Sequence, residues 1–141
     1  MDLTFLGTGG SVPTTKRNTV SMALRPGPEV LLFDCGEGTQ RQLMASTVSF
    51  MRISRIFISH QHGDHFLGLP GLVQSMNFYG RTGPLDIYGP QGTGELVSSI
   101  LRLGVFDLKY AVNGHDLAPG DRVVGDGYAV EAFRAEHPLP A

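Results

Sequence analysis

Short apolar runs and alternating apolar and polar positions dominate the chain, a pattern typical of strands. Four runs are mostly aliphatic or aromatic, and each is followed by Gly, Asp or His. These features predict strands at residues 2–6, 30–33, 55–59 and 85–88. Alternation and nearby turn residues predict further strands at residues 19–24, 106–112, 122–124 and 128–133.

Helical spacing appears between the predicted strands. Leu69, Leu72, Val73 and Met76 recur at intervals of three and four residues, which predicts an amphipathic helix that tolerates Pro70 only in its first turn. A second helix is expected to carry four apolar residues on one face, namely Leu96, Val97, Ile100 and Leu101. A short helix is expected at residues 39–45. This order of strands and helices indicates the α/β class.

Length and composition limit the possible architectures. With 141 residues, 41% of them hydrophobic, the chain can fill one modest core. No apolar run approaches the roughly 18 residues of a membrane span, and the N-terminus reads as a strand, not as a signal peptide. The single cysteine, Cys35, excludes an internal disulfide. We therefore expect a cytoplasmic protein that makes no membrane contact.

Charge is unevenly distributed along the chain. Residues 1–60 carry six Lys or Arg against four acidic residues, whereas residues 61–141 carry five against nine, for a formal net charge of −2. Proteins that bind nucleic acids usually show a basic surface, and this chain as a whole does not predict one.

The most informative stretch follows the predicted strand at residues 55–59. His60 and His62 lie two positions apart, so that in extended chain both imidazoles can reach one ion. Gly63 permits a turn, after which Asp64 and His65 suit a second ion. Imidazole and carboxylate ligands together favour zinc, with manganese or iron as alternatives. The pattern therefore predicts a binuclear metal site.

Other residues have two interpretations on sequence alone. Asp34, at a strand end, can accept a hydrogen bond from a ligand imidazole or cap a turn or helix. Cys35 is interpreted as a buried residue or as packing near the site. His115 is interpreted as a turn residue. His137 lies near the C-terminus, where a solvated histidine is the ordinary expectation.

The metal-binding stretch resembles a known motif. His-x-His-x-Asp-His at residues 60–65 resembles the metal motif of the metallo-β-lactamase superfamily. Phe-Leu-Gly-Leu-Pro-Gly-Leu at 66–72 and Asp-Cys-Gly-Glu-Gly-Thr-Gln at 34–40 are similar to segments of ribonuclease Z. The opening, with Phe-Leu-Gly-Thr at 5–8, then Pro-Thr and Arg-Asn, resembles the same family.

The resemblance implies an αββα sandwich, of which residues 1–141 would form the N-terminal half, a mixed sheet with flanking helices. The C-terminal half of the domain would lie outside this chain, with the bridging aspartate, the last histidine ligand and the tRNA-gripping arm. It also implies two zinc ions in the complete active site. His60, His62 and His137 would hold the first ion, and Asp64 and His65 would contribute to the second.

The implied activity is removal of the 3′ trailer from precursor tRNA, leaving a 3′-hydroxyl on the tRNA and a 5′-phosphate on the trailer. Asp64 would be the catalytic residue, accepting the proton of the attacking water, and the enzyme would be a homodimer. Two alternatives remain open. The negative charge favours a hydrolase of small phosphodiesters or thioesters with the same fold, and a truncated fragment would be inactive.

Overall fold

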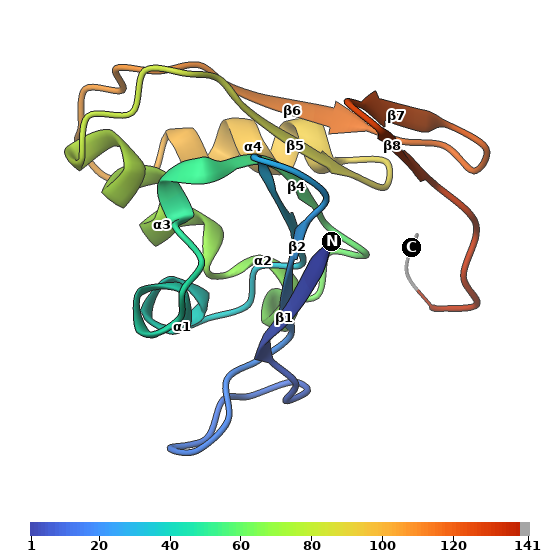
Figure 1. Ribbon diagram of the computed structural model, residues 1–141, viewed down its shortest axis with the longest axis horizontal. Helices are drawn as coiled ribbons and strands as arrows, with labels where there is room; N and C mark the ends of the chain where they lie inside the picture. Colours follow the sequence, from blue (N-terminus) through green and yellow to red (C-terminus); the bar gives the residue numbers. More distant parts are fainter. Residues whose placement is uncertain (139–141) are drawn as a thin grey trace.

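The computed structural model describes residues 1–138, and a six-stranded mixed sheet is its framework (Figure 1). The strands lie side by side in chain order. The first three pair antiparallel, and the remaining pairs are parallel. Their bounds are β1 (Asp2–Gly7), β2 (Ser21–Arg25), β3 (Val30–Phe33), β4 (Ile53–Phe57), β5 (Leu85–Gly89) and β6 (Val112–Asp116).

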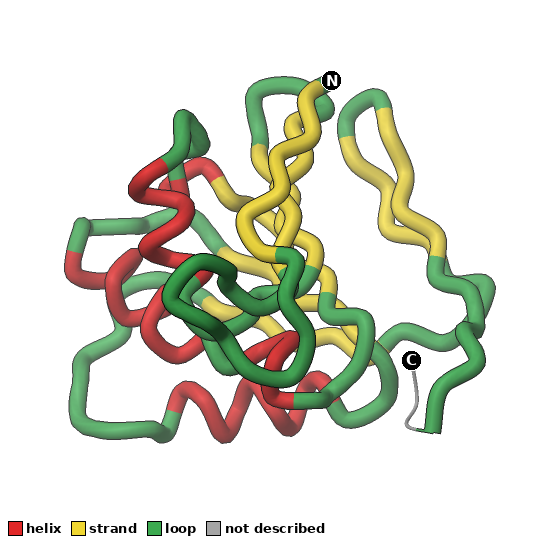
Figure 2. The backbone as a smooth tube through the Cα atoms, turned by 90° about the horizontal axis from the view of Figure 1, so that it is seen from below, coloured by secondary structure: helices red, strands yellow, loops and turns green. Residues whose placement is uncertain are grey.

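Helices occupy the crossovers between the parallel strands, because parallel neighbours cannot be joined by a tight turn. The three main helices are α1 (Thr39–Ala45), α3 (Leu69–Phe78) and α4 (Thr93–Leu101). Figures 1 and 2 show them gathered on one side of the sheet. Two shorter turns, η1 (Phe50–Arg52) and α2 (Gly63–Phe66), lead into and out of β4. The expected mixed sheet with flanking helices is confirmed.

The main core lies between the sheet and these helices. It contains fully buried aliphatic side chains from the strands, such as Leu32 and Ile56, and from α3, such as Leu72. Burying each such side chain contributes about 1.5–3 kcal/mol relative to leaving it exposed. The helix predicted from Leu69, Leu72, Val73 and Met76 is therefore confirmed as α3, with Pro70 in its first turn.

The opposite face of the sheet carries a row of aromatic side chains. Phe33, Phe57 and Tyr88 are register partners on β3, β4 and β5, with successive ring centroids 5.2 and 5.1 Å apart. On β1, at the edge of this face, Phe5 is 63% exposed. Part of this face is covered by a hairpin of β7 (Arg122–Gly125) and β8 (Tyr128–Glu131), which Figure 2 shows apart from the helices.

A polar contact fastens this hairpin to the sheet. The Tyr128 hydroxyl donates to Glu29 Oε1 at 2.6 Å, and Arg55 donates to the Tyr128 oxygen at 2.7 Å. Ser54 donates to the other Glu29 oxygen. The chain that leaves β8 toward the C-terminus therefore starts from a fixed point.

The strand predicted at residues 106–112 is wrong. Residues 106–111 are not in a strand, although Ala111 O accepts the Leu85 N–H of β5, and the last parallel strand, β6, begins at Val112. The alternation of apolar and polar residues at 106–112 arises from packing against α3. Tyr110 is buried there, and its hydroxyl donates to Val73 O at 2.8 Å. Asn77 of α3 bonds the backbone of this segment at Asp107 and Lys109. The alternation therefore reflects a loop packed against α3, whose Asn77 side chain bonds its backbone, and not a strand.

The interpretation of His115 as a turn residue is also wrong, because it lies within β6. Strand propensity does not predict this strand, because it contains Asn, Gly and Asp, which are rare in strands. The glycine has a packing reason, since a Cβ at Gly114 would lie 2.9 Å from Val97 Cβ on α4. His115 stacks on Tyr88 and bonds Asp86 Oδ1 at 2.8 Å, away from the histidines of residues 60–65.

The other predicted strands are confirmed with small changes at their ends. The largest shift is in β4, which starts and ends two residues before the predicted 55–59. The helix predicted at 39–45 matches α1, whereas α2 and η1 were not predicted. Within residues 1–138, no helix combines the length and the apolar character needed to cross a membrane. The assignment of residues 1–141 as half of a domain stays a prediction.

Candidate metal centre

The site lies where β3 and β4 end. These strands are parallel, so their carboxyl ends reach the same edge of the sheet. Asp34 follows β3, and Ser59 and His60 follow β4. The chain then enters α2, whose first turn carries Asp64 and His65. Sequence reasoning placed the histidines at the end of a strand, and this placement is confirmed.

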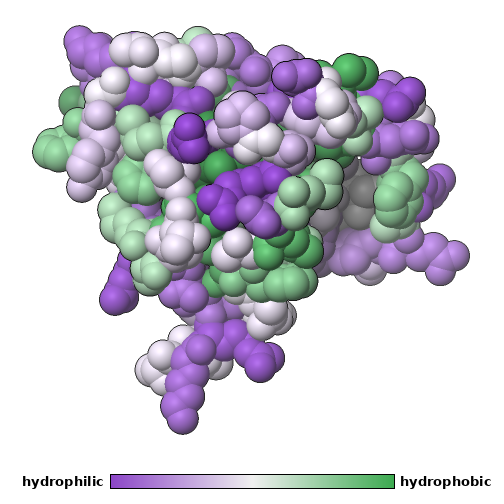
Figure 3. Space-filling model, in the orientation of Figure 1, coloured by the Kyte–Doolittle hydropathy of each residue, from purple (hydrophilic) through white to green (hydrophobic). Residues whose placement is uncertain are grey.

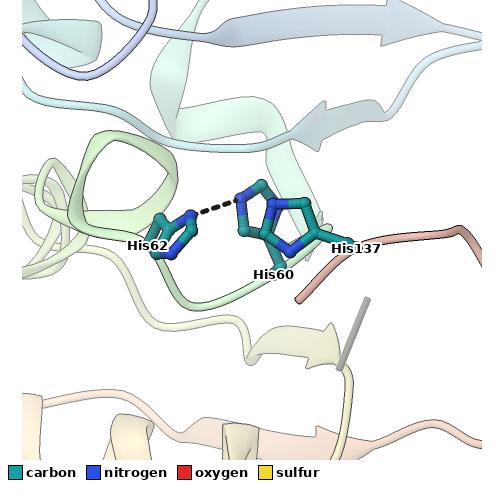
Figure 4. A group of neighbouring side chains, drawn as sticks. All are labelled: His60, His62 and His137. Atoms are coloured by element: carbon teal, nitrogen blue, oxygen red, sulfur yellow. Dashed lines mark hydrogen bonds between the residues drawn. The ribbon is translucent and has the colours of Figure 1, made fainter. Parts of the chain in front are cut away.

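Three imidazoles converge although one comes from the far end of the chain. His60, His62 and His137 each offer a ring nitrogen, and these nitrogens lie within 4.8 Å of one another (Figure 4). His60 Nε2 and His62 Nδ1 are 3.1 Å apart, and the His60 and His137 rings have centroids 4.1 Å apart. His60 is buried, whereas the other two are exposed.

Asp64 and His65 form a second group beside the first. Asp64 Oδ2 lies 3.4 Å from His65 Nε2, and the centroids of the His60 and His65 rings are 4.0 Å apart. The backbone N–H of Ser11 donates to Asp64 Oδ2 at 2.8 Å, from a residue in the left-handed region at φ 61°. Ser11 belongs to the loop of residues 8–20, whose tip projects as a largely hydrophilic finger at the bottom of Figure 3.

Of the two interpretations of Asp34, the structure supports the one in which it accepts a hydrogen bond from an imidazole. Its Oδ2 lies 2.7 Å from His65 Nδ1, and its Oδ1 accepts the Ser59 backbone N–H at 2.7 Å. It does not cap α1, whose N-cap is Gly38. Asp34 has φ 58°, an unusual conformation that Asp tolerates better than most residues and that costs of order 1–3 kcal/mol.

Tight backbone contacts join the chain after β3 to α2. Cys35 N donates to His65 O at 2.8 Å, and Gly68 N donates to Cys35 O at 2.9 Å. A Cβ at Gly36 would lie 2.4 Å from Asp64 O, and one at Gly68 would lie 2.3 Å from Gly36 O. The glycines therefore allow the approach that sets α2 beside Asp34.

Cys35 is fully buried, as one of its two interpretations held. Burial raises the pKa of its thiol to about 12. The thiolate is therefore disfavoured at neutral pH, and the residue serves packing.

Burial and neighbouring charge shift two pKa values in the site. Desolvation lowers the pKa of His60, and the imidazoles of His65, His137 and His62 lower it further. Burial alone would raise the pKa of Asp64, but the Ser11 N–H and the charge of His65 hold it below its ordinary value. Both shifts favour a neutral imidazole beside a carboxylate, the forms that bind metal ions.

The lowered pKa of His60 predicts acid sensitivity of the metal-free chain. Below the ordinary value of 6.5, the unfolded chain takes up a proton at His60 that the folded chain resists. Folding stability is therefore expected to fall as pH drops from 7.5 to 5.5. Thermal unfolding in the presence of a chelator measures this, and a midpoint that stays constant over this range would contradict it.

The donor set fits zinc. Zinc sites in proteins are commonly built from imidazole nitrogens and carboxylate oxygens in a four-coordinate arrangement. The first group supplies three imidazoles that already converge, and the second supplies one imidazole and one carboxylate. Each of the five predicted ligand residues lines the same depression, together with Gly10, Ser11, Gly63 and Leu67.

Sequence reasoning missed two residues of this arrangement. Ser59 was predicted only as the last residue of the strand at 55–59 and was given no role, although its position directly before His60 was a signal. Ser11 lies far away in the sequence, and no local pattern linked its N–H to Asp64.

The mixed sheet with helices on one face, and the histidine cluster at the ends of its strands, define a protein of the metallo-β-lactamase fold. A crystal structure of human tRNase Z, short form, is similar with a TM-score of 0.82 and 36% identity, over 99% of this chain and 62% of that chain. A metallo-β-lactamase fold protein of Bacillus subtilis matches with a TM-score of 0.79 over 98% of this chain and 54% of its own. At 20% identity, this second likeness concerns the fold.

The chain belongs to the family described as anti-Pycsar protein Apyc1, whose family model matches residues 1–137. It is 52% identical over 139 residues to ribonuclease Z of Methanosarcina acetivorans, which covers 99% of this chain and 46% of that protein. Ribonuclease Z of Pyrococcus horikoshii is 43% identical over 141 residues, 100% of this chain and 46% of that protein. The chain thus spans about half the length of these relatives, and its predicted resemblance to ribonuclease Z is confirmed.

Proposed function

We propose that this chain is the N-terminal, metal-binding half of a zinc-dependent endoribonuclease that removes the 3′ trailer from precursor tRNA. The observation that carries the proposal is the convergence of His60, His62 and His137 beside Asp64 and His65. The 52% identity to a protein named ribonuclease Z supports the choice of substrate. Homodimer formation and a cytoplasmic location belong to the same proposal and rest on the ribonuclease Z resemblance.

Two ions per complete active site are proposed. His60, His62 and His137 would hold the first, and Asp64 and His65 would contribute to the second. A zinc pair supplies Lewis-acid activation of water and stabilisation of charge on a phosphate. Four-coordinate zinc requires more than the two ligands of the second group, so residues outside this chain would complete that position.

The chain's own residues prepare the site for hydrolysis of a phosphodiester. The lowered pKa of His60 keeps its imidazole neutral near pH 7. Asp64, whose pKa is held low by the Ser11 N–H and His65, stays a carboxylate and would accept the proton of the attacking water. Burial of Asp34 and its contacts orient His65.

A chimaera tests this function. Residues 1–137 are joined to the remaining part of the Methanosarcina acetivorans relative, and the product is assayed with a precursor tRNA that carries a 3′ trailer. We expect a tRNA with a 3′-hydroxyl and a trailer with a 5′-phosphate. The isolated 141-residue chain, lacking the other half, is expected to show no turnover.

A small phosphodiester, bis(p-nitrophenyl) phosphate, is the second substrate in the same assay. Its hydrolysis without cleavage of precursor tRNA would contradict the proposal. That result would favour the alternative hydrolase of small substrates, which the net charge of −2 also favours.

A further inference from the structure

The Ser59 hydroxyl lies among three polar groups of the site. Ser59 Oγ is 2.8 Å from Asp34 Oδ2, 3.0 Å from His60 Nδ1 and 3.2 Å from His65 Nδ1. The backbone N–H of Ser59 also donates to Asp34 Oδ1 at 2.7 Å. One serine therefore contacts both oxygens of the carboxylate and one nitrogen of each of two imidazoles.

These contacts determine where the protons lie. A carboxylate only accepts, so the single hydroxyl proton of Ser59 is donated to Asp34 Oδ2. The Ser59 oxygen is then an acceptor toward His60, whose Nδ1 must carry the ring proton. His65 Nδ1 donates directly to Asp34 Oδ2 at 2.7 Å. Both imidazoles thus carry a proton on Nδ1, so that Nε2 is the nitrogen each can offer to an ion.

The carboxylate at the centre of these contacts is held rigidly. Asp34 N donates to Phe57 O at 2.8 Å, and Ser21 Oγ donates to Asp34 O at 2.9 Å. Asp34 is 7% exposed and has the left-handed φ of 58° already described. The backbone that carries the carboxylate is therefore fixed by hydrogen bonds to β4 and to the Ser21 side chain.

We infer that Ser59 is a positioning residue through which Asp34 orients the His60 ring, in addition to the His65 ring that Asp34 contacts directly. One carboxylate then fixes the ring orientation and the tautomer of one imidazole in each ligand group. His65 is held directly, and His60 is held through the serine hydroxyl. The inference rests on the proposed zinc site for its functional meaning, but the proton assignment stands on the hydrogen bonds alone.

Zinc affinity of the 141-residue chain, measured by competition with a chromophoric chelator, tests this role. Loss of a hydrogen-bond partner behind a ligand typically weakens metal binding by about 10–100-fold. We expect Ser59→Ala to weaken zinc binding by about 10-fold, at the lower end of that range. Ser59→Thr keeps the hydroxyl and is expected to restore affinity.

Ser46→Ala is the matched control. Ser46 is the C-cap of α1, and its hydroxyl donates to Leu43 O at 2.8 Å, outside the site. It is expected to leave zinc affinity unchanged. Equal affinities of Ser59→Ala and Ser46→Ala would overturn the role of Ser59.

A second measurement does not depend on the variants folding. Nitrogen-15 chemical shifts of the His60 ring in the metal-free chain, near pH 8, report which nitrogen carries the proton. We expect protonated Nδ1, and protonated Nε2 would overturn the inference. A wild-type chain that binds no zinc would refute the proposed metal site instead, while this tautomer measurement would still decide the role of Ser59.

Discussion

Replacing His60 by alanine is expected to abolish zinc binding to the chain, from about one ion per chain to none at micromolar free zinc. His60 is the buried member of the three converging imidazoles, and its ring lies within 4.8 Å centroid distance of both His62 and His137. Removing it leaves two exposed imidazoles, too few to hold a four-coordinate ion tightly. Metal content of the dialysed protein by atomic emission measures the effect.

The control for this experiment is His115→Ala. His115 is also an imidazole bonded to a carboxylate, Asp86, but it lies on β6 outside the site. Its removal is expected to leave zinc content unchanged. Similar losses in both variants would indicate non-specific binding, and unchanged content in His60→Ala would refute the assignment of the first ion. His137→Ala is expected to lower occupancy as well, and by less because His137 is exposed.

Asp64→Asn is expected to lower kcat of the chimaera with precursor tRNA by about 10³-fold, within the range for loss of a general base. The amide is nearly isosteric and keeps an oxygen for the Ser11 N–H, so the fold is expected to survive. It cannot accept a proton, and it is a weaker metal ligand than a carboxylate. Single-turnover cleavage at saturating enzyme separates this loss from weaker substrate binding.

Asp86→Asn provides the matched control, because Asp86 also pairs with a histidine but lies on β5 away from the site. Its cleavage rate is expected to equal that of the unmodified chimaera. Near-normal turnover by Asp64→Asn would remove Asp64 from the catalytic role, whatever its effect on metal content.

The ligand stretch could be recognised from sequence because its geometry is local. His60 and His62 are two residues apart at the end of a strand, and Asp64 and His65 follow in the next turn. His137 was different, since its approach depends on the β7–β8 hairpin and no local pattern reports that. Only the family resemblance suggested that it joins the other imidazoles.

The errors in the fold have a common physical origin. Alternation at residues 106–112 reports an extended chain with one side buried, but it does not say whether a strand or a helix provides the hydrogen bonds. In the structure, the Asn77 side chain of α3 bonds the backbone at Asp107 and Lys109, and β5 bonds Ala111 through the Leu85 N–H. Conversely, β6 was missed because glycine has low strand propensity. Gly114 is needed there because a side chain would clash with α4.

The aromatic row on the sheet gives the protein a built-in optical signal. The chain has no tryptophan and four tyrosines, so its near-ultraviolet spectrum arises mainly from tyrosine and phenylalanine. Tyr88 is held between Phe57 and His115, with centroid distances of 5.1 and 4.6 Å. Fixed ring packing produces near-ultraviolet circular dichroism that disappears when packing is lost. The protein, without an added label, therefore reports whether this layer of rings keeps its order in those variants described above that leave its rings in place.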